Sequence, residues 1–199
     1  MKTQLRPLAI LFGVLALITG FLYPLAVTGL AQLIFPFQAN GSLVKVNEQV
    51  VGSELIGQDF SGEQFFWGRL SATSTHPYNA FEQESMTGSL GSNLGPLSQV
   101  LVDNMQKRVN MLMKVDPGNT NLIPVDLVTA SASGLDANIS VSSALYQVPR
   151  VARVRGLEEA TVIALVNQYT ENRQFGLLGE PRVNVLLLNL ALEGIKYRK

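Results

Sequence analysis

The stretch that decides the fold covers residues 8–30, which read LAILFGVLALITGFLYPLAVTGL and are almost wholly apolar. No charged residue occurs between Arg6 and Lys45. At about 1.5 Å per residue, a helix of this length extends for roughly 34 Å, which is enough to cross a hydrocarbon core of about 30 Å. No later stretch repeats the pattern. The sequence therefore predicts one transmembrane helix over residues 8–30.

The charges on either side of this helix predict its orientation. Lys2, Arg6 and the amino terminus precede the helix, whereas the first cation after it is Lys45. Basic residues tend to stay on the cytoplasmic side of a membrane. We therefore expect a short cytoplasmic N-terminus over residues 1–7 and a linker over residues 31–40. Residues 41–199 are then expected to form a single periplasmic or extracellular domain.

A cleaved signal peptide is the alternative interpretation of the same stretch. Gly29, Leu30 and Ala31 place small residues at a plausible cleavage site. The apolar run is, however, longer than the roughly 7 to 15 residues of an ordinary signal-peptide core. Its length favours a helix that is retained as a membrane anchor.

Small residues recur along one face of the predicted helix. Ala9, Gly13, Ala16 and Gly20 follow one another at spacings that place them in a single stripe. Small side chains let helices approach closely in a membrane, so this stripe is predicted to pack against a partner helix. The alternative is that glycine and alanine are simply frequent in membrane helices. Pro24 is expected to bend or end the outer third of the helix.

Composition excludes several classes of function. The chain has 15 basic and 15 acidic residues and therefore no net charge, and no basic patch suggests a nucleic-acid partner. It has no cysteine, which excludes disulfides, thiolate metal sites and a cysteine nucleophile. The expected partner of the apolar anchor is membrane lipid.

The part of the chain after the anchor has a mixed pattern that predicts an α+β fold, with a small sheet and several helices. Short β-branched runs predict a hairpin of residues 43–46 and 49–56 and further strands at residues 65–67 and 123–129. Residues 70–96 are rich in Ser, Thr, Gly and Asn and lack periodicity. They are expected to form a long ordered loop or a binding surface.

Helices are predicted where apolar residues keep helical spacing or where capping residues occur. Ser140 is a candidate N-cap and Pro149 a candidate first residue of a separate helix. Arg150, Arg153 and Arg155 are expected to form a solvated basic edge, with an acidic partner or lipid headgroups as the alternative. The predicted helices cover residues 100–113, 140–147, 149–156 and 157–169, and a last helix starts at residues 180–181.

Catalytic and metal-binding motifs are weak or missing. The only histidine, His76, precedes a proline in the polar loop, so a Ser-His-Asp triad is not favoured. Ser42 and Lys45 have the S-x-x-K spacing of a serine–lysine hydrolase but lack its other motifs. The glycine-rich residues 88–96 have no lysine to follow a phosphate, and ligand spacings for zinc or calcium are absent from the sequence.

Several sequence blocks, in one order along the whole chain, resemble the C subunit of the bacterial Kdp potassium-transporting P-type ATPase. These blocks cover residues 41–44, 51–58, 66–69, 71–72, 91–96, 126–131, 133–136, 139–140, 147–152 and 179–186. The motif residues that we single out as candidate site residues are Trp67, Arg69, Asn93, Gly95, Asp136, Gln147, Arg150, Glu180, Arg182 and Asn184.

This resemblance implies an accessory subunit that the potassium-import complex needs for assembly and activity. The complex uses ATP, magnesium and potassium, and its other components are a potassium-binding channel-like subunit, an ATP-hydrolysing pump subunit and a small single-pass subunit. Members of the family are described as a catalytic chaperone that raises the affinity of the pump subunit for ATP. The predicted orientation disagrees with direct nucleotide contact, so no catalytic residue and no directly bound cofactor are expected. The alternative function is a membrane-anchored extracytoplasmic hydrolase that uses Ser42 and Lys45.

Overall fold

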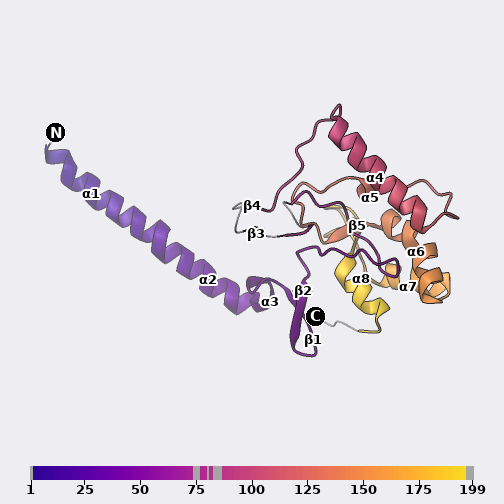
Figure 1. Cartoon of the computed structure of the whole chain (residues 1–199). Coiled ribbons are helices and arrows are strands. Elements are labelled where there is room, and N and C mark those ends of the chain that lie inside the picture. The colour runs from indigo at the N-terminus through magenta and orange to yellow at the C-terminus, as the bar shows by residue number, and fades with distance from the viewer. Residues whose placement is uncertain (1, 74–76, 80, 83–86, 196–199) are drawn as a thin grey trace. The chain divides into compact units, whose positions relative to one another are not determined.

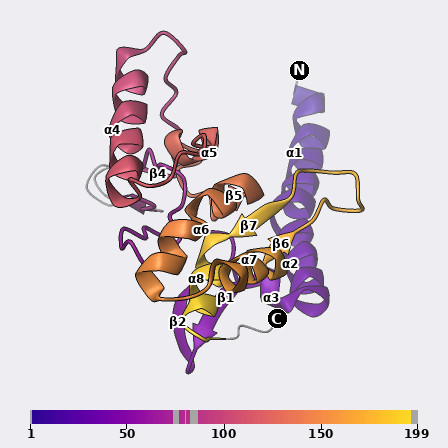
Figure 2. The same cartoon turned by 90° about the vertical axis from the view of Figure 1, so that its right-hand side faces the viewer.

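The computed structural model describes residues 2–73, 77–79, 81–82 and 87–195. The chain divides into two compact units, Met1–Leu43 and Val44–Lys199. Figures 1 and 2 show their helices and strands. In chain order these are α1 (Lys2–Leu17), a π-helical turn η1 (Ile18–Leu22), α2 (Tyr23–Ile34), α3 (Pro36–Ala39), β1 (Leu43–Val46), β2 (Gln49–Ser53), β3 (Phe81–Glu82), β4 (Thr87–Gly88), α4 (Gln99–Val115), α5 (Val125–Val128), β5 (Asn138–Ser140), α6 (Val141–Arg155), α7 (Glu159–Gln168), β6 (Thr170–Glu171), β7 (Arg182–Asn184) and α8 (Val185–Leu192).

The first unit contains the apolar helix that the sequence predicts. Gln4–Ile34 forms a helix of 31 residues that is long and apolar enough to cross a membrane. The helix does not end at Pro24. Instead, the turn before the proline widens into η1, and the Thr19 hydroxyl donates a 2.8 Å hydrogen bond to the carbonyl of Leu15. Such local changes let a membrane helix tolerate a proline.

The predicted hairpin is confirmed. β1 and β2 form a two-stranded sheet. They are joined by Asn47 and Glu48, whose φ angles of 49° and 66° are both positive. A two-residue turn with two positive φ angles matches the twist of the flanking strands, so this turn fixes the register of the hairpin.

The main sheet of the domain was not predicted in its observed form. Its strand order is β5-β7-β6 and both pairings are antiparallel. Ile139 on β5 and Thr170 on β6 lie opposite Val183 on the central strand. The prediction that the last helix starts at residues 180–181 is therefore wrong, because Arg182–Asn184 is this central strand and α8 follows it.

Three other predicted elements differ from the structure. Residues 65–67 lie outside every strand, and residues 123–129 contain the short helix α5 rather than a strand. Pro149 does not begin a helix, because α6 runs through it without a break. Val148, Arg150 and Val151 are buried on either side of the proline, so the packing of α6 outweighs the missing hydrogen-bond donor.

The remaining helix predictions are confirmed. α4 covers the predicted residues 100–113, and α7 lies within the predicted residues 157–169. Ser140 caps α6, because its side chain accepts a hydrogen bond from the backbone N–H of Ser143. The described part of residues 70–96 is mostly irregular, as predicted, apart from the short pair β3-β4. His76 and the basic residues 196, 198 and 199 lie outside the described residues.

The core is built on α6, α7 and α8, which Figures 1 and 2 show grouped around the small sheet, with α4 at the edge of the domain. A second group of buried residues joins α4 and α5 to Trp67. The main group consists of Phe66, Ile139, Ala144, Val148, Val151, Ala152, Val162, Val166, Val183, Val185 and Leu188. Phe66 and Trp67 therefore connect the two groups, and this places the segment around them at the centre of the domain.

Candidate functional site

The first group of motif residues surrounds Trp67, the only tryptophan of the chain. Its side chain is buried, and the guanidinium carbons of Arg150 and Arg108 lie 4.5 Å and 4.9 Å from the centroid of its ring. An aromatic face attracts a cation more strongly when both are removed from water. Trp67 therefore stabilises two arginine side chains that come from different helices, α6 and α4.

Arg150 is the largest fully buried side chain of the domain, with 1% of its surface exposed. It donates hydrogen bonds to the carbonyls of Glu63 and Phe65 and a 2.7 Å bond to Oε1 of Gln147. No carboxylate among the described residues forms an ion pair with it. Burial lowers the pKa of Arg150 to about 10. Arg150 is therefore a structural cation that ties residues 63–65 to α6.

Two side-chain amides explain why residues 65–67 are not a strand. Oε1 of Gln147 accepts a 2.8 Å hydrogen bond from the N–H of Trp67, and Nε2 returns a 3.1 Å bond to the Trp67 carbonyl. Asn189 pairs in the same way with the N–H and carbonyl of Phe66, at 2.8 Å and 3.0 Å. Buried backbone groups need such partners. The amides of α6 and α8 take the place of a neighbouring strand.

The prediction of a solvated basic edge on α6 is wrong for Arg150 and Arg155, whereas Arg153 is exposed as predicted. Arg150 is buried, and the other two arginines have partners within the domain. Arg153 forms a 2.7 Å ion pair with Asp116, and Arg155 forms a 2.5 Å ion pair with Glu193. These pairs join the end of α6 to the residues that follow α4 and α8.

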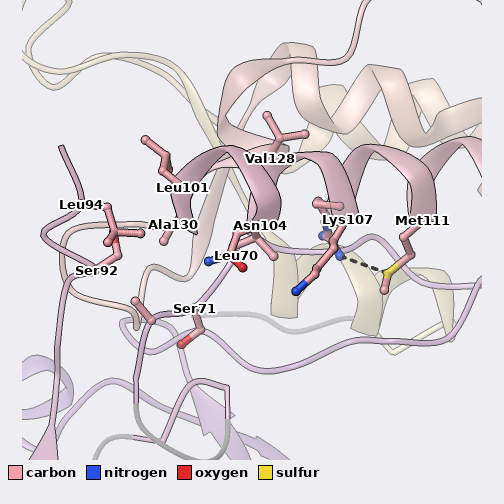
Figure 3. Close-up of a pocket in the computed structure, with 12 residues that line it drawn as sticks. Leu70, Ser71, Ser92, Leu94, Leu101, Asn104, Lys107, Met111, Val128 and Ala130 are labelled. Carbon is pink, nitrogen blue, oxygen red and sulfur yellow. Dashed lines mark hydrogen bonds between the residues drawn. The ribbon is translucent and has the colours of Figure 1, made fainter. Parts of the chain in front are cut away.

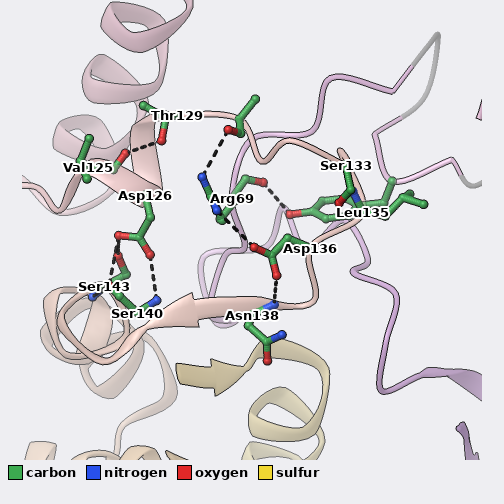
Figure 4. A network of polar contacts seen from close by, with 12 residues as sticks. Arg69, Val125, Asp126, Thr129, Ser133, Leu135, Asp136, Asn138, Ser140 and Ser143 are labelled. Atoms are coloured by element: carbon green, nitrogen blue, oxygen red, sulfur yellow. Dashed lines mark hydrogen bonds and ion pairs between the residues drawn. The ribbon is translucent and has the colours of Figure 1, made fainter. Parts of the chain in front are cut away.

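The second group of motif residues is more open to solvent and is centred on Arg69 and Asp136 (Figure 4). Their side chains form a 3.2 Å ion pair with about a quarter of each surface exposed, at 25% and 30%. Arg69 also donates a 3.3 Å bond to the carbonyl of Ala130. Oδ1 of Asp136 accepts a 3.0 Å bond from the N–H of Asn138, at the start of β5. The pair therefore joins the segment after Trp67 to the edge of the main sheet.

Asp126, which binds the start of α6, is a further residue of this region that the sequence analysis did not single out. Figure 4 shows its carboxylate directed at the start of α6. It accepts hydrogen bonds from the N–H of Ser140, at 2.8 Å, and from the hydroxyls of Ser140 and Ser143. A negative charge is favourable at a helix N-terminus. Sequence signals for this site exist in the serines at positions 140 and 143, but they do not identify the aspartate that binds them.

The remaining motif residues of this region lie around an open cavity of about 640 Å³. Arg69, Asp126 and Asp136 line the cavity on one side, and Glu180 and Arg182 on another. Glu180 pairs with Arg173 at 2.6 Å and Arg182 pairs with Glu171 at 3.1 Å, both near the surface. Asn184 has a different role, because its side chain caps α8 by accepting a 3.1 Å bond from the N–H of Leu187.

Asn93 and Gly95 belong to neither group. Both are exposed, and Asn93 has a positive φ of 51°. The carbonyl of Gly95 accepts a 2.9 Å bond from the N–H of Ser98, directly before α4. These two residues therefore shape the turn that leads into α4.

The four small residues of the membrane helix are all exposed. A side chain built at Gly13 or Gly20 would meet no atom within 4 Å. The face of the helix with Ala9, Gly13, Ala16 and Gly20 is thus open to a partner. The packing of this stripe stays a prediction.

The structure does not support the serine–lysine hydrolase. Ser42 is buried, whereas Lys45 is exposed on β1, so the lysine amine is not placed beside the serine hydroxyl as a general base would be. Within the described residues, no group of three or more histidine or acidic side chains is placed to hold a metal ion. The motif side chains instead cap helices, form ion pairs or hydrogen-bond to backbone N–H and carbonyl groups.

Comparisons with known proteins agree with the resemblance seen in the sequence. The family model KdpC, described as "K+-transporting ATPase, c chain", matches residues 5–194. A potassium-transporting ATPase KdpC subunit of Polaromonas naphthalenivorans is 57% identical over 196 residues, which cover 98% of this chain and 97% of the relative. The subunit of Methylibium petroleiphilum is 55% identical with 98% of both chains covered, and that of Methylococcus capsulatus is 53% identical with 98% and 100% covered.

Proposed function

The chain belongs to the KdpC family of K+-transporting ATPase c chains, and from this we propose that it is a non-catalytic accessory subunit of the Kdp complex. The observation that carries the proposal is the contrast between the helix Gln4–Ile34 and the domain after it. The helix is exposed and suited to a membrane, whereas the motif side chains of the domain are largely used within the fold. Assembly and regulation of the complex require surfaces and an anchor rather than a reaction centre.

The proposed topology follows from charge. Lys2 and Arg6 precede the apolar residues 8–30, and no charged residue follows until Lys45. By the positive-inside rule the N-terminus is cytoplasmic and the domain is on the periplasmic side of the bacterial inner membrane. The helix then packs on the channel-like subunit, and the domain covers the outer mouth of that subunit. The pump subunit and the small single-pass subunit complete the complex.

Cysteine labelling tests this topology, because the chain has no cysteine of its own. Thr3→Cys and Thr120→Cys are placed before the helix and on an exposed part of the domain. In intact spheroplasts, a membrane-impermeant maleimide is expected to label Thr120→Cys and not Thr3→Cys. Both are expected to react after the membrane is solubilised. The reverse pattern in intact spheroplasts contradicts the proposed orientation.

The small-residue stripe supplies the packing surface for the proposed partner helix. Gly13→Leu or Gly20→Leu adds a bulky side chain where close approach is needed. We expect either variant to lower the amount of this chain that copurifies with a tagged pump subunit. Leu15→Ala, on another face of the helix, is the control. Equal retention of all three variants contradicts packing through the stripe.

ATP and magnesium are proposed to act on other components of the complex. The sequence has no P-loop, and the described residues contain no cluster of carboxylates for magnesium. We expect the purified full chain in detergent to show no binding of magnesium-ATP by calorimetry. A dissociation constant in the low micromolar range, about −7 to −8 kcal/mol, contradicts this part of the proposal. Any effect on transport is then indirect, through a preference for particular states of the complex.

A further inference from the structure

A groove runs along α4 at the edge of the domain (Figure 3) and adjoins the Trp67 group at Arg108, which lines the groove and also lies over the Trp67 ring. Its volume is about 320 Å³. Leu94 lies at one end and Met111 at the other, and α4 forms one wall (Figure 3). Leu70, Val128 and Ala130 contribute to the lining from other segments. The groove therefore has an apolar lining, although α4 itself is exposed along much of its length.

The charged side chains that line the groove are all positive. Lys107 and Arg108 come from α4, and among the residues that the structure describes no aspartate or glutamate is part of the lining. Arg108 donates to the carbonyls of Leu127 and Gly68, at 3.1 Å and 2.9 Å, and forms no ion pair within the described residues. Lys107 is exposed and forms no hydrogen bond or ion pair there. Two cations without a carboxylate partner favour an anionic occupant.

Polar groups at the groove favour a peptide over an acyl chain. Ser92 and Asn104 line it beside the apolar side chains and are exposed, whereas the Ser71 hydroxyl, also in the lining, already donates a 2.7 Å bond to the carbonyl of Gly134. Hydroxyl and amide groups can pair with the backbone of a bound chain, whereas the hydrocarbon of a lipid would leave them without partners. Protein interfaces commonly combine an apolar centre with a polar rim and an arginine.

We propose that the groove between α4 and the residues around Leu70 and Leu94 docks a segment of another ATPase component in which an acidic residue adjoins an apolar side chain. The carboxylate binds Lys107 and Arg108, and the apolar side chain fills the space between Leu94 and Met111. This inference rests on the proposed function, since the partner is another component of the same complex. It adds a second contact, made by the domain, to the contact proposed for the membrane helix.

Photo-crosslinking in the purified complex tests the location of the partner. p-Benzoylphenylalanine in place of Asn104, which lines the groove, is expected to crosslink to another protein component. The same group in place of Asn110, which is exposed on α4 outside the lining, is the matched control. Mass spectrometry is expected to map the Asn104 crosslink to a segment that contains aspartate or glutamate. A crosslink to lipid, to a segment without an acidic residue, or from position 110 alone overturns the proposal.

A pair of methionines on α4 tests the charge requirement. Met111 lines the groove and is 50% exposed, whereas Met113 is 59% exposed and is not part of the lining. Met111→Glu is expected to weaken binding of the chain to the remaining components about tenfold, because it adds a negative charge beside an acidic partner. Met113→Glu is expected to leave binding unchanged. Equal binding by both variants contradicts the proposal.

Charge reversal provides the decisive measurement. Lys107→Glu is expected to weaken binding, and replacement of the mapped acidic residue of the partner by lysine is expected to restore it. Lys114→Glu, on the same helix outside the lining, is the control. Failure of the rescue overturns the assigned contact. If the unaltered chain itself does not copurify with the complex, the proposed function fails instead, so the two failures are distinguishable.

Discussion

The two groups of motif residues differ in how much of their polar chemistry is used within the domain. Around Trp67, the buried Gln147 and Arg150 form hydrogen bonds with backbone carbonyls, with the Trp67 N–H and with each other. Around the open cavity, Arg69 and Asp136 are partly exposed, and the Arg182–Glu171 pair lies closer to the surface. The first group therefore holds the domain together, whereas the second keeps charged groups available to solvent or to a partner.

The motif residues of one family therefore have separate roles, in stability around Trp67 and in exposed charge around the cavity. When a buried hydrogen bond loses one partner, the group left behind is unsatisfied. The free energy of unfolding then falls by the full desolvation penalty of that group. An exposed ion pair contributes little, because water and salt screen it. Substitutions should therefore separate the groups by their effect on the free energy of unfolding, with large losses around Trp67 and small ones at the exposed ion pairs of the cavity.

Gln147→Leu is expected to have the largest effect. It leaves the N–H and carbonyl of Trp67, and one donor of Arg150, without their buried partner. At about 1 kcal/mol or more for each of these three unsatisfied groups, the free energy of unfolding should fall by at least about 3 kcal/mol. Urea unfolding of the full chain in detergent, followed by the fluorescence of Trp67, measures this loss directly.

Gln106→Leu is the matched control for that measurement. Gln106 is exposed on α4, and its amide donates one 2.8 Å bond to Asn110. Its substitution should change the free energy of unfolding by less than about 0.5 kcal/mol. Similar losses for Gln147→Leu and Gln106→Leu would remove the distinction between the two groups.

The same contrast explains which parts of the fold were predictable from the sequence. The membrane helix, the β1–β2 hairpin, α4 and α7 follow from local apolar patterns and turn residues. Residues 65–67 have an apolar pattern typical of a strand, but their partners are amides that lie far along the chain. The pattern indicates that these residues are buried, but it does not identify the side chains that form hydrogen bonds with their backbone groups.

The site shows the same limit. Ser140 was predictable as a helix cap because its role is local to α6. The roles of Arg150 and Asp126 were not, since each depends on contacts between segments that are distant in sequence. Arg182–Asn184 is too short to predict as a strand, and only its pairing with β5 and β6 defines it. Long-range contacts therefore account for most of what the sequence analysis missed.

Asp126→Ala is expected to have the second largest effect. The substitution removes the acceptor of hydrogen bonds from the N–H and hydroxyl of Ser140 and from the hydroxyl of Ser143. Because hydrogen bonds to a charged group and a helix cap are lost together, the free energy of unfolding should fall by about 2 kcal/mol. Asp103→Ala, on the exposed side of α4, is the control for urea unfolding. A loss below that of the control would show that Asp126 belongs with the solvent-exposed groups.

Tyr78→Phe tests the boundary between the two groups through pH. The Tyr78 hydroxyl donates a 2.5 Å bond to the carbonyl of Arg69, and burial raises the pKa of Tyr78 to about 12. Since the unfolded chain loses this proton near pH 10, the contribution of Tyr78 to stability is complete below about pH 10 and is lost as the pH rises to about 12. Burial also raises the pKa of Tyr146, so absorbance at high pH should show more than one late tyrosine titration, and Tyr78→Phe should remove the one near pH 12.

The same variant should lower the free energy of unfolding by about 1 kcal/mol at neutral pH, because one hydrogen bond is lost. Tyr23→Phe, in the exposed membrane helix, is the control. If the titration near pH 12 persists in Tyr78→Phe, the buried hydroxyl assigned to Tyr78 belongs to another tyrosine.

The smallest effect is expected for the ion pair of Arg182 and Glu171 at the cavity. The side chains are 56% and 41% exposed, so solvent screens their 3.1 Å contact. A double-mutant cycle with Arg182→Gln and Glu171→Gln should give a coupling energy below about 0.5 kcal/mol, and this value should fall further as salt is added. A coupling energy above about 1 kcal/mol would mean that the open cavity stabilises the fold as the Trp67 group does. A small value would instead mean that Arg182→Gln does not change folding, so its retention in the assembled complex would measure the contribution of Arg182 to assembly.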